Sequence, residues 1–234
     1  MTRLPKQREQ ADPDPKESRL PFLSGTPDLA ALLDEASLST VAKAQEVVEL
    51  RRDFAARSGG QLASCARQAA ARFAVGGRLL TFGNGTSATD AQQLVTLFLY
   101  PGGAARPLPA IGLASDVAVT TSLSNDIGVE VVFARQIAAF GRPADIAVGL
   151  STGGNSANLL RAFEEASRRG LLTIAFAGYN GGKLAELESL DYLFVASSSS
   201  VHRIQETQTT IYHVLWELIV AELGQHVPLS GSAG

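Results

Sequence analysis

Short apolar runs alternate with helix-like segments along most of this 234-residue chain. The runs are rich in Val, Ile, Leu and Phe, and they occupy residues 78–83, 107–114, 145–150, 171–178 and 192–197. Four of them precede a segment with apolar residues at helical spacing, the last from about Arg203 to Leu223. Parallel strands buried on both faces have this near-continuous apolar character, because crossover helices cover the sheet. The pattern therefore predicts an α/β fold with a five-stranded parallel sheet in a three-layer α/β/α sandwich.

The part of the chain before the first apolar run has a helical pattern. Residues 27–77 carry apolar positions at three- and four-residue spacing, and Gly59-Gly60 and Gly76-Gly77 interrupt them, so at least two helices are expected. Residues 1–26 mix prolines with charges and offer few large apolar side chains, which predicts a flexible leader. Residues 225–234 are expected to be a flexible tail. The domain organisation predicted between them is a single domain over residues 27–224.

Two turns that follow predicted strands are built alike. Residues 82–91, "FGNGTSATDA", place two glycines before Ser87 at an expected helix start, and residues 149–158, "GLSTGGNSAN", place two glycines before Ser156. In a parallel sheet, ligands bind beyond the carboxyl ends of the strands, where backbone N–H groups and helix N-termini are exposed. Glycine lets the backbone approach an anion, and hydroxyls add neutral donors. The two turns are therefore candidates for binding a phosphate group.

Ordinary helix capping is the alternative for either turn alone, because Ser and Thr are common N-caps and Gly is common in turns. Two such turns in one sheet favour ligand binding. Neither turn has the G-x-G-x-x-G order of a dinucleotide site or the G-K-[ST] of a nucleotide triphosphate loop. Nucleotides are therefore disfavoured as the main ligand.

Composition and charge narrow the class of protein. Hydrophobic residues make up 45% of the chain, the formal net charge is −3, and no long block of like charge suggests a nucleic-acid or membrane partner. Cys65 is the only cysteine, which excludes an intramolecular disulfide and multi-cysteine zinc sites. Residues 1–28 lack the apolar core of a signal peptide, and no later segment has roughly eighteen uninterrupted apolar residues. A cytoplasmic protein is expected.

Five stretches in order resemble a known family: "GNGTSATDA", "SNDIGVEVVFARQI", "GRPADIAVGLSTGGNSANLLRAF", "GYNGGKLAEL" and "RIQETQTTIYHVLWELI". The sequence resembles the SIS (sugar isomerase) domain family, specifically the phosphoheptose isomerases that interconvert sedoheptulose 7-phosphate and a heptose 7-phosphate. The resemblance covers about residues 30–223 and implies a flavodoxin-like fold with N-terminal helices. It also implies a homotetramer with sites between subunits.

The resemblance implies roles for particular residues. The sugar phosphate would be bound by Ser151, Thr152 and Ser156. Asn84 and Ser87 would contact the sugar, and Asp126 would hydrogen-bond its hydroxyls. Gln205 and His213 stand at two of the four positions that form the family's catalytic and zinc-binding site.

The other two of those four positions depart from the family pattern. Where the resemblance leads one to expect a His and, four residues on, a Glu, this chain has Gln93 and Leu97. Leucine neither accepts a proton nor binds a metal, and glutamine is a poor zinc ligand beside histidine. No zinc or other cofactor is therefore expected, and the usual base is missing. Gln93 is a candidate for binding the substrate instead.

Other groups could supply the missing chemistry. Asp90 occupies a position that the family uses structurally, so it is not expected to serve as the base. His202 stands where the isomerases commonly have an Asp and is a substrate-binding candidate, the alternative being a solvated loop histidine. His213 is a candidate acid or base, the alternative being a histidine packed at a helix or subunit contact. Eight helical residues span about 12 Å, so Gln205 and His213 share a ligand only at the helix mouth or through a bridging ligand.

Two functions follow from these residues. The first is a ketose–aldose isomerase acting on a seven- or eight-carbon sugar phosphate, a reaction that needs a base for a carbon-bound proton and an acid or metal at the carbonyl oxygen. The second is a non-catalytic SIS-domain regulator that binds a sugar phosphate or docks on another protein. The complete phosphate loops favour the first, and the loss of the His and the Glu favours the second.

Overall fold

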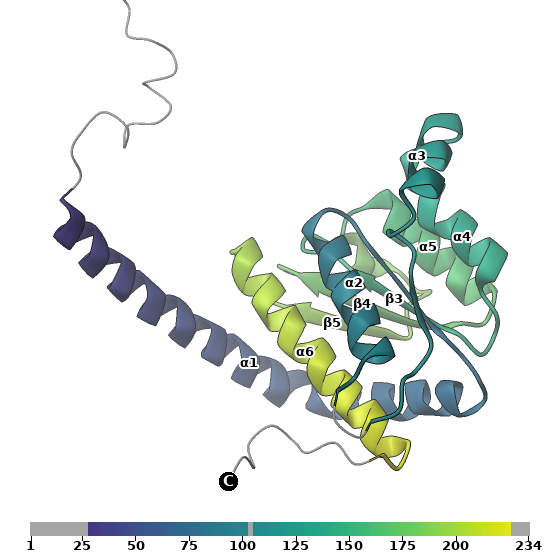
Figure 1. Cartoon of the computed structure of the whole chain (residues 1–234), viewed down its shortest axis with the longest axis horizontal. Helices are drawn as coiled ribbons and strands as arrows, with labels where there is room; N and C mark the ends of the chain where they lie inside the picture. The colour runs from purple at the N-terminus through teal and green to yellow at the C-terminus, as the bar shows by residue number, and fades with distance from the viewer. Residues whose placement is uncertain (1–27, 103–104, 226–234) are drawn as a thin grey trace, which may run out of the picture. The chain divides into compact units, whose positions relative to one another are not determined.

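The computed structural model describes residues 28–102 and 105–225. Its centre is a five-stranded parallel sheet in the order β2-β1-β3-β4-β5. Figure 1 labels β3, β4 and β5 in this sheet. The strands are β1 (Leu79–Gly83), β2 (Ala110–Gly112), β3 (Ile146–Leu150), β4 (Leu172–Gly178) and β5 (Tyr192–Ala196). The predicted five-stranded parallel sheet is confirmed, and each strand lies inside the apolar run that predicted it.

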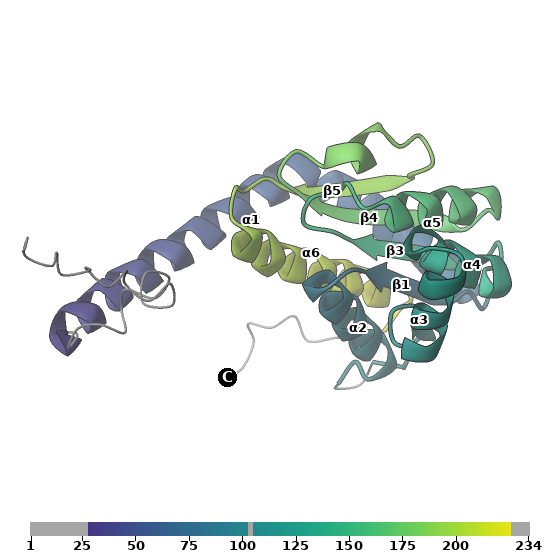
Figure 2. The ribbon, with the colours of Figure 1, turned by 90° about the horizontal axis from the view of Figure 1, so that it is seen from above.

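Helices cover both faces of this sheet. The helices are α1 (Leu29–Ala74), α2 (Thr86–Leu99), α3 (Val117–Asp126), α4 (Val132–Phe140), α5 (Ala157–Arg168) and α6 (Val201–Glu222). One apolar cluster joins α1, α2 and α6 to the strands, and a second joins α4 and α5 to the opposite face. Figure 2 shows the strands between α6 and α5. The predicted three-layer α/β/α sandwich is confirmed.

The chain divides into two units, Met1–Ala44 and Gln45–Gly234. The described part of the first unit is the beginning of α1, and the rest of α1 and all other elements belong to the second. The predicted leader, residues 1–26, and all of the predicted tail except Gln225 lie outside the described residues. A single domain over 27–224 stays a prediction.

The expected helix break at Gly59-Gly60 is wrong. A single helix, α1, runs through both glycines and ends at Ala74. Glycine in a helix interior costs about 1 kcal/mol relative to alanine, but Phe54 and Leu62 on either side of the pair are buried in the core. Their burial outweighs the weak backbone preference. The expected break at Gly76-Gly77 is confirmed.

Residues 181–190 also differ from the expected helix. They contain only a 3-10 helix, η4 (Gly182–Glu186), because Gly181 and Gly182 both have positive φ, which an α-helix does not use. A second 3-10 helix, η3 (Val129–Val131), leads into α4. Within the described residues, no helix has the length and apolar character to cross a membrane. The cytoplasmic location stays a prediction.

Candidate active site

The loops that follow β1 and β3 lie next to each other. The two strands pair in parallel with Gly83 beside Leu150, so both loops leave the carboxyl edge of the sheet together. The order places this pair where the chain direction across the sheet reverses, which is where flavodoxin-like folds bind their ligands. A pocket of about 400 Å³ lies there. It is lined by Asn84, Ser87, Leu150, Ser151, Thr152, Gly153, Asn155 and Ser156.

Five of the predicted substrate-binding residues are thus brought together in one pocket. They are Asn84, Ser87, Ser151, Thr152 and Ser156. A larger groove of about 750 Å³ lies between α3 and α4, but its lining is mainly apolar and includes none of the loop residues. Ranking the cavities by volume alone would therefore select the groove between α3 and α4. The sequence pattern and the sheet topology instead favour the smaller pocket as the candidate site.

Glycine is required at two places in these loops. A Cβ on Gly83 would lie 2.6 Å from the carbonyl oxygen of Ser87, so only glycine lets α2 begin so close to β1. Gly154 has a φ of +68°, and a Cβ there would lie 2.0 Å from the carbonyl oxygen of Gly181. Both glycines therefore serve close backbone packing around the pocket.

The two helices that begin at the pocket have no side-chain caps. The N-cap residues are Gly85 for α2 and Ser156 for α5, and neither makes a capping hydrogen bond from its side chain. In the first turns the N–H groups of Ser87, Ala88 and Leu159 already donate to backbone carbonyl oxygens. The N–H groups of Thr86, Ala157 and Asn158 and the Ser156 hydroxyl remain available to a ligand. No Lys, Arg or His is among the residues that line the pocket. The site offers neutral donors and two positive helix ends, which suits a phosphate group.

Hydrogen bonds fix the two loops in place. The Asn84 and Asn158 side chains exchange two hydrogen bonds of 2.9 Å, which join the first loop to α5. The Ser151 hydroxyl accepts a bond from the backbone N–H of Gly154 at 2.9 Å. Gln208 Nε2 on α6 donates to the Ser151 carbonyl oxygen at 2.9 Å, and Gln208 is fully buried. Sequence reasoning missed Gln208, because only the packing of α6 on the loop reveals its partner.

A second polar group lies where α2 faces α6. Gln205 Nε2 on α6 donates to Asp90 Oδ2 on α2 at 3.2 Å. Asp90 is half-buried, and burial raises the pKa of its carboxyl group, while the hydrogen bond from Gln205 offsets part of that rise. Gln93 is exposed and Leu97 is half-buried against the core, further along the same helix.

His213 lies about two turns after Gln205 on α6. Its Nδ1 is 2.7 Å from the carbonyl oxygen of Thr209, and since a carbonyl only accepts, Nδ1 carries the proton and Nε2 is left with a free lone pair. The imidazole stacks on Tyr212 with ring centroids 4.9 Å apart. Burial raises the pKa of Tyr212, and the negative charge of Asp90 adds to the rise. In the neutral imidazole, the contact with Thr209 therefore leaves Nε2 as the nitrogen without a proton.

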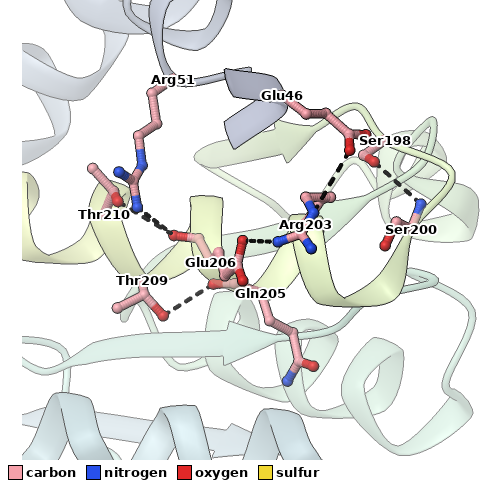
Figure 3. Close-up of polar contacts among 9 residues, drawn as sticks. All are labelled: Glu46, Arg51, Ser198, Ser200, Arg203, Gln205, Glu206, Thr209 and Thr210. Atoms are coloured by element: carbon pink, nitrogen blue, oxygen red, sulfur yellow. Dashed lines mark hydrogen bonds and ion pairs between the residues drawn. The ribbon is translucent and has the colours of Figure 1, made fainter. Parts of the chain in front are cut away.

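Ionic contacts hold the first turn of α6 against α1. The buried Arg203 pairs with Glu206 and lies 3.6 Å from Glu46 Oε2, and Arg51 donates to the Glu206 carbonyl oxygen at 3.5 Å (Figure 3). Figure 3 also shows the Gln205 side chain directed away from this group of charges. The opposite sides of one helical turn therefore anchor α6 and present Gln205 toward α2.

Three predicted substrate-binding residues are not among those lining the loop pocket. Asp126 is exposed at the end of α3, where its carboxylate accepts hydrogen bonds from Asn125 and Ser122. His202 is exposed in the first turn of α6, and Gln93 is exposed on α2. Their roles in binding stay predictions, as do those of the residues in the pocket.

The donor set does not fit the zinc site that the family resemblance implies. Gln93, Leu97, Gln205 and His213 occupy the four positions, and only His213 is a good zinc ligand. Across residues 28–102 and 105–225, no group of three or more His, Cys, Asp or Glu side chains is arranged to hold a metal ion.

Comparison with known proteins shows the family to which this chain belongs. Residues 44–178 match the family described as "SIS domain". The phosphoheptose isomerase of Aquifex aeolicus is 41% identical over 179 residues, which cover 75% of this chain and 91% of that protein. The solved phosphoheptose isomerase of Neisseria gonorrhoeae superposes with a TM-score of 0.72 at 30% identity, over 81% of this chain and 99% of its own. The enzyme from Francisella tularensis gives 0.71 at 32% identity, over 81% and 98%.

Proposed function

Because this chain belongs to the SIS domain family and to the phosphoheptose isomerases within it, we propose that it is a ketose–aldose isomerase of a seven- or eight-carbon sugar phosphate. Sedoheptulose 7-phosphate is the first substrate to test. The observation that carries the proposal is the loop pocket, where neutral hydroxyl, amide and backbone donors meet the uncapped N-termini of α2 and α5.

The phosphate group is the anchor of the proposed substrate. Ser151, Thr152 and Ser156 bind it with the N-terminus of α5, and Asn84 and Ser87 bind the adjoining sugar hydroxyls. Such an anchor fixes one end of a flexible sugar and leaves the carbonyl end to the catalytic groups, which lowers the entropic part of the barrier. The substrate carbonyl end then lies along the side of α2 that faces α6.

The oxygen-bound proton moves through His213 in this proposal. Its Nε2 accepts the proton of the O1 hydroxyl and returns it to O2, as the carbonyl group shifts from C2 to C1. The Thr209 carbonyl oxygen holds the required tautomer by accepting the Nδ1 proton. Gln205 donates a hydrogen bond from its amide near the same end of the substrate.

A Ser156→Ala variant distinguishes phosphate binding from helix capping. A capping serine loses about 1 kcal/mol of stability on this change, whereas the Ser156 side chain makes no capping bond. We expect less than about 0.5 kcal/mol loss of unfolding free energy, together with a KM for sedoheptulose 7-phosphate about ten- to a hundredfold higher, since hydrogen bonds to charged groups contribute about 1.5–3 kcal/mol. Ser167→Ala, an exposed serine on α5, is the matched control. An unchanged KM with lowered stability would mean ordinary capping.

A regulator without catalysis is the second candidate function. Leu97 and Gln93, at positions where the family pattern has a base and a zinc ligand, favour it. A protein of this kind binds sedoheptulose 7-phosphate, seen as saturable broadening of its phosphorus NMR signal, without converting it. Formation of the aldose isomer in the same sample, with or without added zinc, would reject this candidate.

We also propose a homotetramer with sites between subunits. Apolar side chains remain exposed on the described surface, Val48 of α1 at 41% and Val214 of α6 at 37% among them. A groove of about 220 Å³ between these helices is lined mostly by apolar side chains. Sedimentation equilibrium is expected to give four times the chain mass of 24.6 kDa, and a monomer at micromolar concentration would contradict the assembly.

A further inference from the structure

One face of α2 carries a carboxylate toward α6. Asp90, Gln93 and Leu97 are spaced i, i+3 and i+7, so they share one side of the helix. The hydrogen bond from Gln205 shows that Asp90 on this side meets α6. Of the three residues, only Asp90 has an ionisable side chain. It follows Ser87 of the loop pocket by one helical turn, a rise of about 4.5 Å.

The surroundings of Asp90 preserve its ability to accept a proton. Its carboxylate is half-buried, and its partner is the neutral amide of Gln205 rather than a cation. Among the described residues, none of the ion pairs within 4.0 Å involves Asp90. A carboxylate with a cationic partner is a weaker base, whereas burial makes it a stronger one. Burial does raise the pKa of Asp90, in the direction that general-base catalysis at neutral pH requires.

His213 follows Gln205 on α6 by eight residues, about 12 Å along the axis. Side chains on a helix lean toward its N-terminus, and the contact of Nδ1 with the Thr209 carbonyl oxygen orients the His213 ring accordingly. The inference requires that the imidazole and the Asp90 carboxylate both contact the carbonyl end of one substrate.

We propose that Asp90 is the base that moves the carbon-bound proton in this chain, with Gln205 as the residue that positions it. The inference rests on the proposed isomerase function. The Asp90 carboxylate takes a proton from C1 of the ketose, the electron pair of that C–H bond forms the C1=C2 bond, and the π pair of the C2=O2 bond moves onto O2 to give an enediolate. His213 transfers the oxygen-bound proton from O1 to O2, and the Asp90 carboxylic acid, whose proton exchanges with solvent, delivers a proton to C2 as the carbonyl group forms at C1. All atoms and charges balance without another reactant.

Gln205 has a defined part in this arrangement. Its amide N–H donates a hydrogen bond of 3.2 Å to Asp90 Oδ2. This bond fixes the orientation of the carboxylate and leaves Oδ1 to take the proton. Arg203 and Glu206 anchor the opposite side of that turn, so the amide is presented from a rigid helix (Figure 3). Leu97 stands where the family pattern has a Glu, so the expected base is missing. Asp90 is a carboxylate that remains on the same face of α2.

An Asp90→Asn variant tests the assignment. The amide has nearly the shape of the carboxylate, and its oxygen still accepts the Gln205 bond, but it cannot take a proton. We expect kcat for sedoheptulose 7-phosphate to fall by about 10²–10⁴-fold, while the dissociation constant of the substrate changes less than threefold. Deuterium incorporation at C1 and C2 in heavy water should fall in parallel. Asp53→Asn, on an exposed part of α1, is the matched control and keeps full activity.

The outcomes separate this inference from the proposed function. If the unaltered protein shows neither turnover nor exchange, the isomerase function fails. If it is active and Asp90→Asn keeps kcat within threefold, or loses substrate affinity in proportion to kcat, Asp90 is not the base although the function stands. Should Asp90→Asn fail to fold, Asp90→Glu and Asp90→Gln make the same carboxylate-to-amide comparison. Tenfold or greater activity of the Glu variant over the Gln variant supports the inference, and equal activity overturns it.

Discussion

Gln208 offers a test of whether α6 positions the phosphate loop. Gln208→Leu removes the bond of 2.9 Å to the Ser151 carbonyl oxygen and leaves that buried oxygen without the amide donor. An unmet buried acceptor costs about 1–3 kcal/mol. The same change removes Gln208 Oε1, which is buried with no partner among the described residues, so part of the cost is offset. We expect a net loss of about 1–2 kcal/mol of unfolding free energy.

Thermal unfolding and substrate binding measure the two consequences. For a chain of this size, 1 kcal/mol corresponds to a change in Tm of about 2–4 °C, so Gln208→Leu should lower Tm by about 2–8 °C. Because the Ser151 loop loses its tether, the dissociation constant of sedoheptulose 7-phosphate should rise about tenfold, or 1.4 kcal/mol. Thr207→Val is the control, since Thr207 is equally buried and its hydroxyl has no hydrogen-bond partner among the described residues. Lowered stability with unchanged affinity in Gln208→Leu would refute the proposed tether.

Three further outcomes follow from the structure. Gly154→Ala should unfold the loop or lower stability by more than about 2 kcal/mol, since Gly154 has positive φ and the Cβ would collide with Gly181, whereas Gly60→Ala, in open space on α1, should be neutral or stabilising in thermal melts. Burial raises the pKa of Asp90, so its charged form opposes folding. The contribution of Asp90 to stability is therefore present below its unfolded pKa of about 3.9 and is lost as pH rises through the folded pKa. Asp90→Asn should have the higher Tm at pH 7, and this difference should disappear below about pH 4. Cys65 is buried, and burial raises the pKa of its thiol, so it should resist thiol reagents in the native protein and react in guanidinium chloride; rapid native labelling would contradict its burial.

The sheet follows from the sequence because each strand is buried on both faces. Ile146–Leu150 and Leu172–Gly178 are fully buried, and their continuous apolar character is visible without any structure. The helix boundaries are harder to predict from the sequence, since they depend on contacts between residues that are far apart in the chain. Gly59-Gly60 lies inside α1 because flanking side chains such as Phe54 pack in the core, a long-range effect that local preference does not contain.

The loop pocket could also be predicted from the sequence. Glycines and hydroxyls follow two strands that the α/β order places side by side, so Ser87 and Ser156 could be expected to meet. The pairing of Asp90 with Gln205 could not, because it depends on which sides of α2 and α6 face each other. For the same reason the sequence treats Asp90 as structural, and only the packed helices give it a neutral partner and partial burial.

Interconversion of a ketose phosphate and an aldose phosphate by this chain is tested most directly by NMR. The purified protein is incubated with sedoheptulose 7-phosphate in heavy water, with and without zinc, beside the His213→Ala variant. Deuterium is expected at C1 and C2 of the sugar, and His213→Ala is expected to lose this exchange. Absence of exchange in the unaltered, folded protein, with phosphate signals that broaden on binding, would contradict the isomerase and leave a sugar-phosphate-binding protein.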